Sequence, residues 1–212
     1  VLGSGLGICS PDLVGPLCDK LEADLGGQGM FMNGAQGGMI TADNRLLANV
    51  GAAYPSALGA GGAVGVWNSS DISWIGNTFA QNVGAAAGEG HGGALAINGT
   101  HAVTIYDNRF DANWAAMLGV LVSAGGGIEV GGTESALVVS NTFNANMAAL
   151  YSGDLNHQTN GEGGALVAFA VDDLVVATNV FSGNVALTSG VTAPGTEGVD
   201  GGAVAINHGK SK

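Results

Sequence analysis

Few side chains in this sequence are of the types that carry out catalysis, and they are scattered along it. The only adjacent acidic pair is Asp172-Asp173, and Arg109 is the only lysine or arginine between residues 61 and 207. Polysaccharide lyases need a basic group that abstracts a proton, and glycoside hydrolases need two carboxylates that flank the bond. Asp172-Asp173 is explained more simply as a solvated turn. We therefore expect no enzyme, with a polysaccharide-active enzyme as the alternative.

Candidate metal ligands are also sparse. Glu89, Glu162 and Asp200 each lie just before a pair of glycines, so they could stack into a line that binds Ca²⁺. Solvated acids in loops are the simpler explanation, and His91 could meet Glu89 as a loop pair. None of the four histidines has the spacing of a zinc site: His91, His101, His157 and His208. We expect no cofactor, with calcium as the alternative.

The charge balance restricts the partners. The sequence contains 17 acidic and five basic residues, which gives a net charge of -12. Nucleic acids and anionic membranes attract clusters of lysine and arginine, so both are disfavoured as partners. No run of about 20 apolar residues occurs, so we expect no membrane insertion. Proteins, a second copy of the chain or carbohydrate remain as candidate partners.

Two features favour an exported protein that is secreted or lies on the cell surface. Cys9 and Cys18 are close in sequence, so we expect a local disulfide, with two free thiols as the alternative. Asn68-Ser69-Ser70 and Asn98-Gly99-Thr100 are N-glycosylation sequons, which makes Asn68 and Asn98 candidate glycosylation sites.

The sequence is organised by two repeated motifs. The motif Asn-x-(Phe/Leu)-x-x-Asn occurs five times, first at Asn44–Asn49, and a Gly-Gly pair lies 16 residues before each of the other four copies. The spacing between successive Gly pairs is 31, 33, 38 and 38 residues, which predicts a solenoid. The four later copies contribute the following residues: Asn77, Phe79, Asn82; Asn108, Phe110, Asn113; Asn141, Phe143, Asn146; and Asn179, Phe181, Asn184.

Alignment of the repeats on their Gly pairs produces columns of alike residues. Large apolar residues alternate with small ones after each pair, which is typical of a strand with one buried face. Identical columns superpose only if successive units stack in parallel about 4.8 Å apart. We predict an all-β fold, a right-handed parallel β-helix of about five rungs, in which each Phe stacks on the next and the Asn residues form hydrogen-bonded ladders at the turns.

The remaining segments are assigned around this coil. Residues 1–36 are predicted to form an N-terminal cap that includes a short helix, residues 37–207 the β-helix, and residues 208–212 a tail. The segments after the second Asn of each motif vary in length and are predicted to loop out. Three outward columns are expected to be exposed. We predict a protein interface from their apolar members: Leu137, Val139, Val175 and Ala205.

The pairing of Gly92-Gly93-Ala94-Leu95 with Phe110-Asp111-Ala112-Asn113, repeated in the other units, resembles the repeats of the polymorphic outer-membrane proteins, a family of chlamydial surface adhesins. The resemblance covers residues 61–207. It implies a right-handed β-helix, export, and an adhesive or scaffolding role. This sequence differs from that family because it has no membrane-barrel segment. We therefore expect a noncatalytic structural or adhesive module that associates with other proteins through its apolar outer face, its loops or the open C-terminal end of the coil. An ice-binding or surface-binding protein is a further alternative.

Overall fold

The computed structural model describes residues 39–53, 57–152, 160–187 and 199–207. The chain divides into two compact units, Val1–Gly34 and Ala35–Lys212, and all described residues belong to the second. The predicted cap at residues 1–36, Cys9, Cys18 and the tail at residues 208–212 lie outside the described residues. The regular structure of the described residues consists of parallel strands.

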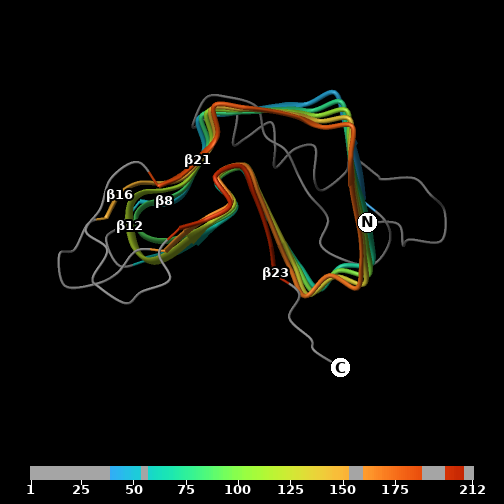
Figure 1. Cartoon of the computed structure of the whole chain (residues 1–212). Coiled ribbons are helices and arrows are strands. Elements are labelled where there is room, and N and C mark those ends of the chain that lie inside the picture. Colours follow the sequence, from blue (N-terminus) through green and yellow to red (C-terminus); the bar gives the residue numbers. More distant parts are fainter. Residues whose placement is uncertain (1–38, 54–56, 153–159, 188–198, 208–212) are drawn as a thin grey trace, which may run out of the picture. The chain divides into compact units, whose positions relative to one another are not determined.

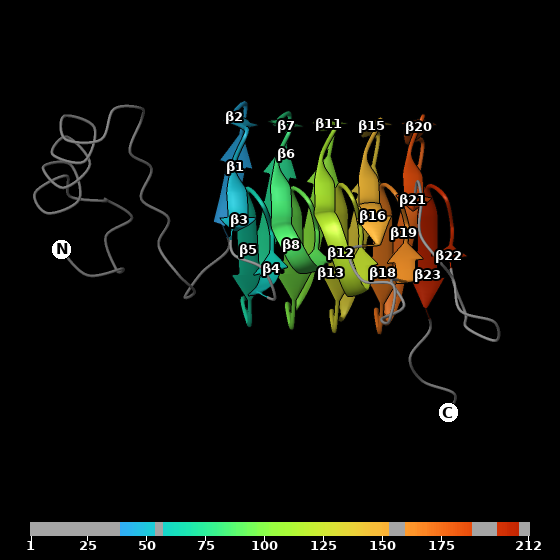
Figure 2. The ribbon, with the colours of Figure 1, turned by 90° about the vertical axis from the view of Figure 1, so that its left-hand side faces the viewer.

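Three of the four sheets have five strands each, and each turn of the chain adds one strand to each of these three (Figures 1 and 2). Sheet A contains β1 (Met39–Ala42), β6 (Asp71–Ile75), β10 (Ala102–Tyr106), β14 (Ser135–Val139) and β19 (Asp173–Ala177). Sheet B contains β2 (Arg45–Leu47), β7 (Thr78–Ala80), β11 (Arg109–Asp111), β15 (Thr142–Asn144) and β20 (Val180–Ser182). Sheet D contains β5 (Val64–Trp67), β9 (Leu95–Asn98), β13 (Ile128–Gly131), β18 (Leu166–Phe169) and β23 (Val204–Asn207).

Sheet C is built from the segments of variable length. It contains β3 (Val50–Ala52), β4 (Ala57–Ala60), β8 (Val83–His91), β12 (Trp114–Ala124), β16 (Met147–Ser152), β17 (Asn160–Glu162), β21 (Val185–Leu187) and β22 (Val199–Asp200). The described parts of these segments, which the sequence predicts only to loop out, are strands that pair in parallel from rung to rung. In Figure 1 the long strands β8 and β12 bend round in a hook.

The register of the strands matches the columns of the sequence. Ile72 pairs with Val103, and Val103 with Ala136, all on the buried face of sheet A. Leu95 and Ile128 pair in the same way in sheet D. Like residues therefore lie over like residues through the core, and the prediction of an all-β parallel β-helix is confirmed.

The Phe residues of the repeated motif stack inside the coil. The ring centroids of Phe79, Phe110, Phe143 and Phe181 are successively 4.9, 4.9 and 5.0 Å apart, with rings within 8° of parallel. The spacing between adjacent parallel strands sets this distance, because successive Phe residues occupy paired positions on those strands. Leu46 continues the column on the other side of Phe79, and Trp74, on the same turn as Phe79, makes an edge contact with its ring at 5.7 Å.

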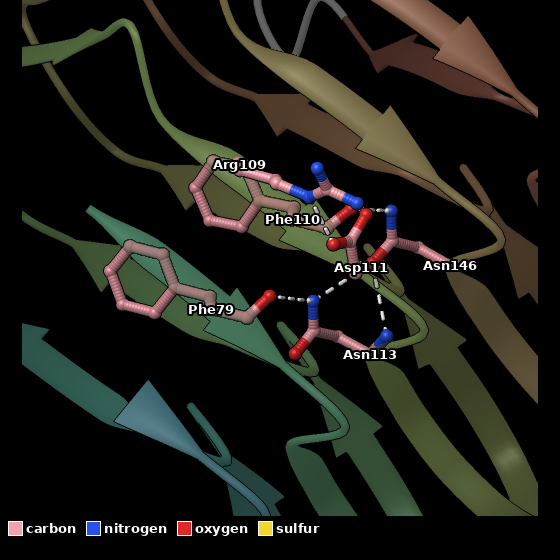
Figure 3. Close-up of polar contacts among 6 residues, drawn as sticks. All are labelled: Phe79, Arg109, Phe110, Asp111, Asn113 and Asn146. Carbon is pink, nitrogen blue, oxygen red and sulfur yellow. Dashed lines mark hydrogen bonds and ion pairs between the residues drawn. The ribbon is translucent and has the colours of Figure 1, made fainter. Parts of the chain in front are cut away.

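The Asn residues of the motif hold the corners between sheets. The side chain of Asn113 donates to the carbonyl of Phe79 at 3.0 Å (Figure 3). Its Oδ1 accepts from both the backbone N–H and the side chain of Asn82. Asn146 repeats the pattern one rung on, with Phe110 as its acceptor (Figure 3). These amides replace the strand hydrogen bonds that a chain loses where it turns.

Each corner also carries a residue in the left-handed backbone region. The residue before every ladder Asn has a φ between +50° and +65°, whether it is Gly76 and Gly183 or a residue with a side chain, such as Gln81, Asp107 or Ala112. This conformation costs about 1–2 kcal/mol for a residue other than glycine. The hydrogen bonds of the Asn ladder offset this conformational cost at each corner.

The two arms of the hook pack closely because their facing residues are small. A Cβ on Gly59 would lie 2.1 Å from the carbonyl oxygen of Gly84, and one on Gly90 would lie 2.0 Å from that of Ala115. Ala85, Ala115, Ala148 and Ala186 of the same sheet are fully or almost fully buried. The abundance of Gly and Ala in these segments is therefore a packing requirement.

Candidate functional site

The second arm of the hook covers the outer face of sheet D. We call this arm the return arm: β4, residues 88–91 of β8, residues 122–124 of β12, β17 and β22. It buries an outward column of sheet D that the sequence predicts to be exposed: Ala96, Glu129, Val167 and Ala205. Ala205 is only 6% exposed and packs in a cluster with Ala124 and Val167. The prediction of Ala205 as an interface residue is therefore wrong.

A groove remains between the return arm and sheet D. Its volume is about 220 Å³, and its lining comprises Leu58, Ala60, Trp67, His91, Ala96, Ile97, Asn98, Glu129 and Phe169. Trp67, Asn98, Gly131 and Phe169 occupy one outward column of sheet D on successive rungs. A Cβ on Gly131 would lie 2.0 Å from the Phe169 ring, so only glycine lets that ring lie there. The groove is thus flanked by two aromatic rings.

Charged groups meet on one wall of the groove. His91 Nδ1 lies 2.7 Å from Glu129 Oε2, and His91 Nε2 lies 3.3 Å from Glu89 Oε1. Glu129 is buried, with 8% of its side chain exposed, and reaches His91 from the neighbouring rung. The hydrogen bond to Glu129 raises the pKa of His91 above its usual 6.5, and the charges of Glu129 and Glu89 add to this, whereas burial opposes it.

A second histidine makes a similar arrangement on the surface. His101 lies 3.1 Å from Asp71 and 3.3 Å from Glu134, and all three side chains are exposed. The hydrogen bond to Asp71 raises the pKa of His101, with the charge of Glu134 contributing next. Water reaches all three groups freely, so the cluster encloses no ligand space.

The outer face of sheet A differs from that of sheet D. We call its outward side chains Ile75, Tyr106, Leu137, Val139 and Val175 the apolar face. Leu137 and Val175 are 39% and 50% exposed, and Tyr106 is 45% exposed. In contrast to the return arm over sheet D, the described residues leave this face open.

The other candidate residues are dispersed. Asp172 and Asp173 are exposed at the start of β19, and Arg109 forms an ion pair with Asp111 on sheet B (Figure 3). Asn68 is exposed at a turn, whereas the half-buried Asn98 lines the groove. Glycosylation at either residue stays a prediction.

The predicted line of calcium ligands is only partly in register. Glu162 pairs with Asp200, whereas His91, and not Glu89, occupies the equivalent position two strands away. Within the described ranges, no group of three or more His, Cys, Asp or Glu side chains is arranged to hold a metal ion. Calcium binding stays a prediction.

Sequence reasoning missed the groove residues Trp67, Glu129 and Phe169 as a group. Each of them departs from its column: Glu129 interrupts a column of mostly small residues, and the two rings share a column with Asn98 and Gly131. A search for column-breaking residues on the same face would have found them.

Comparisons with protein families, with curated proteins and with solved structures give no match to this chain. In the part of the chain that the structure describes, no helix is long and apolar enough to cross a membrane.

Proposed function

We propose that this chain is a noncatalytic, exported structural or adhesive module that associates with another protein through the apolar face. The observation that carries this proposal is the contrast between two faces of one coil. Sheet D has its outer face covered by the return arm, whereas sheet A presents Ile75, Tyr106, Leu137 and Val175 to solvent. Contiguous exposed apolar side chains mark contact surfaces.

The border of the apolar face favours a particular kind of partner. Asp71, Asp173 and Glu134 lie at its edge and are exposed, and the chain carries a net charge of -12. A second copy would bring the same acidic border against it. A protein whose apolar side chains are bordered by lysine and arginine would match both the centre and the edge.

The dimensions of the apolar face bear on the strength of the contact. Four strands about 4.8 Å apart and three residues of about 3.3 Å each define a surface of roughly 15 by 10 Å. A stable interface buries about 800 Å² on each partner. The apolar face alone therefore supports a weak contact, which suits an adhesive protein that makes many of them.

The proposal is tested with a double variant, Leu137→Glu with Val175→Glu, and a matched control, Val180→Glu. Val180 is 57% exposed on sheet B, so the control adds charge to an exposed strand position outside the apolar face. Proteins captured from the extracellular fraction of the source are identified, purified and titrated against each variant. We expect the double variant to bind at least tenfold more weakly and the control to bind within twofold of the unmodified chain.

Two outcomes would overturn this proposal. One is undiminished binding of the purified partner by the double variant. The other is sedimentation of the unmodified chain as a dimer that the double variant dissociates, which would assign the apolar face to self-association instead.

A further inference from the structure

We propose that the groove between the return arm and sheet D is a binding site for one cationic side chain, an arginine or lysine presented by a partner protein. The groove opens on the outer surface of sheet D and shares no residue with the apolar face. The inference therefore stands on its own observations and can fail or hold independently of the proposed interface.

The first observation is the charge of the groove. Glu129 lines it and Glu89 contacts its histidine, so the site carries a charge of -1 when His91 is protonated and -2 when it is neutral. Only one oxygen of Glu129 is used, since His91 bonds to Oε2 and no described residue bonds to Oε1. A buried carboxylate with an open oxygen favours a cation that donates hydrogen bonds to it.

The second observation is the absence of a competing cation in the described structure near the groove. None of its lining residues is lysine or arginine. The two described arginines, Arg45 and Arg109, lie in β2 and β11 of sheet B. The acidic groups of the groove are thus paired with one histidine alone, which leaves negative charge for a ligand to neutralise.

The third observation is the shape and lining of the groove. Trp67 is 51% exposed at one end, and its indole can receive a cation on its face. A volume of about 220 Å³ lies below the 300–1,000 Å³ typical of pockets for whole ligands. The groove therefore suits one long side chain better than an oligosaccharide. A guanidinium suits it best, because its planar donors fit both a carboxylate and an aromatic ring.

The test uses isolated amino-acid derivatives as probes. Nα-acetyl-arginine amide and its neutral isostere, Nα-acetyl-citrulline amide, are titrated into the full chain while the NMR signals of the His91 ring and the Trp67 indole are followed. We expect saturable shifts of both signals with the arginine probe at millimolar concentrations, and at least tenfold weaker binding of the citrulline probe.

Matched variants locate the site. Glu129→Gln should weaken binding of the arginine probe at least tenfold, whereas Glu134→Gln should leave it unchanged, because Glu134 pairs with the exposed His101 instead. Trp67→Leu, at an exposed position, gives an independent readout if Glu129→Gln fails to fold, and it should weaken binding severalfold.

The pH dependence of binding provides a further test. Binding of the arginine probe should tighten as the pH rises from 5.5 to 8, because His91 loses its proton and the groove gains negative charge. Glu89 and Glu129 are the charged groups that face this histidine from β8 and β13. Equal binding of both probes, unchanged binding by the Glu129→Gln and Trp67→Leu variants, or tighter binding of methyl glucoside than of the arginine probe would overturn the inference.

Discussion

The ladder asparagines stabilise the corners of the coil through several hydrogen bonds each. Asn113 is fully buried, and its side chain bonds to Asn82, Phe79 and Asn146. No water reaches these groups to replace a lost partner. The residues that recur most often in the sequence therefore act in folding, and function is more readily sought among the residues that differ between rungs.

Replacement of Asn113 by alanine should be strongly destabilising. The change leaves the backbone N–H of Asn82 and the carbonyl of Phe79 without this partner in a buried site, and each such group costs about 1–3 kcal/mol. We expect a loss of roughly 2–5 kcal/mol in the free energy of unfolding, measured by urea denaturation. Asn184→Ala, at the partly exposed last described rung, should cost less; equal losses would contradict this account.

The ion pair of His91 should make the stability depend on pH. Its pKa is raised in the folded state by Glu129, so its contribution is complete below the unfolded pKa of about 6.5 and is lost as the pH rises through the folded pKa. The melting temperature of the unmodified chain should therefore fall between pH 6 and pH 8 more than that of His91→Gln. His101→Gln, which removes an exposed histidine, serves as the control. Identical pH profiles for the unmodified chain and His91→Gln would rule out this role.

At the scale of the elements, the hook of sheet C depends on residues without side chains. Gly90→Val would place a Cβ 2.0 Å from the Ala115 carbonyl and force the two arms apart. We expect a drop in melting temperature and faster hydrogen exchange along β8 and β12. Gly202→Ala is the control, because nothing lies within 4 Å of its added Cβ. Unchanged exchange in Gly90→Val would show that the arms are not held by this contact.

The core of the coil could be predicted from the sequence because its columns repeat. Phe79, Phe110 and Phe143 must superpose if the strands are parallel, and only one register aligns them. The return arm could not be predicted in this way. Its packing depends on the bare backbone of glycines such as Gly59 and Gly90, and the segments that carry them differ in length.

The groove could not be predicted for a related reason. Trp67 and Phe169 lie three rungs apart in one column, and His91 comes from a different sheet. The position of the return arm alone decides that His91 meets Glu129 and that Ala205 is covered. If the return arm did not pack against sheet D, the whole outer face of that sheet would be exposed.

At the scale of the whole molecule, the acidic charge should oppose the folded state. A net charge of -12 is more concentrated in the folded chain than in the unfolded one, so the charges repel each other more strongly there. Salt at 0.15 M reduces the range of this repulsion to about 8 Å. We expect the melting temperature to rise as NaCl increases from about 0.01 to 0.3 M. Choline chloride should give the same rise, and a fall with both salts would show that attractive ion pairs dominate.

The parallel stacking of the strands has a mechanical consequence. The hydrogen bonds between rungs run along the coil axis, as in the pairing of β10 with β6 and β14. Tension applied along that axis pulls these bonds apart directly and can peel off one rung at a time. Tension applied along the strands loads many of them together in shear. A partner seated on the apolar face of sheet A, pulling parallel to β10 and β14, would therefore load the coil in its stronger direction.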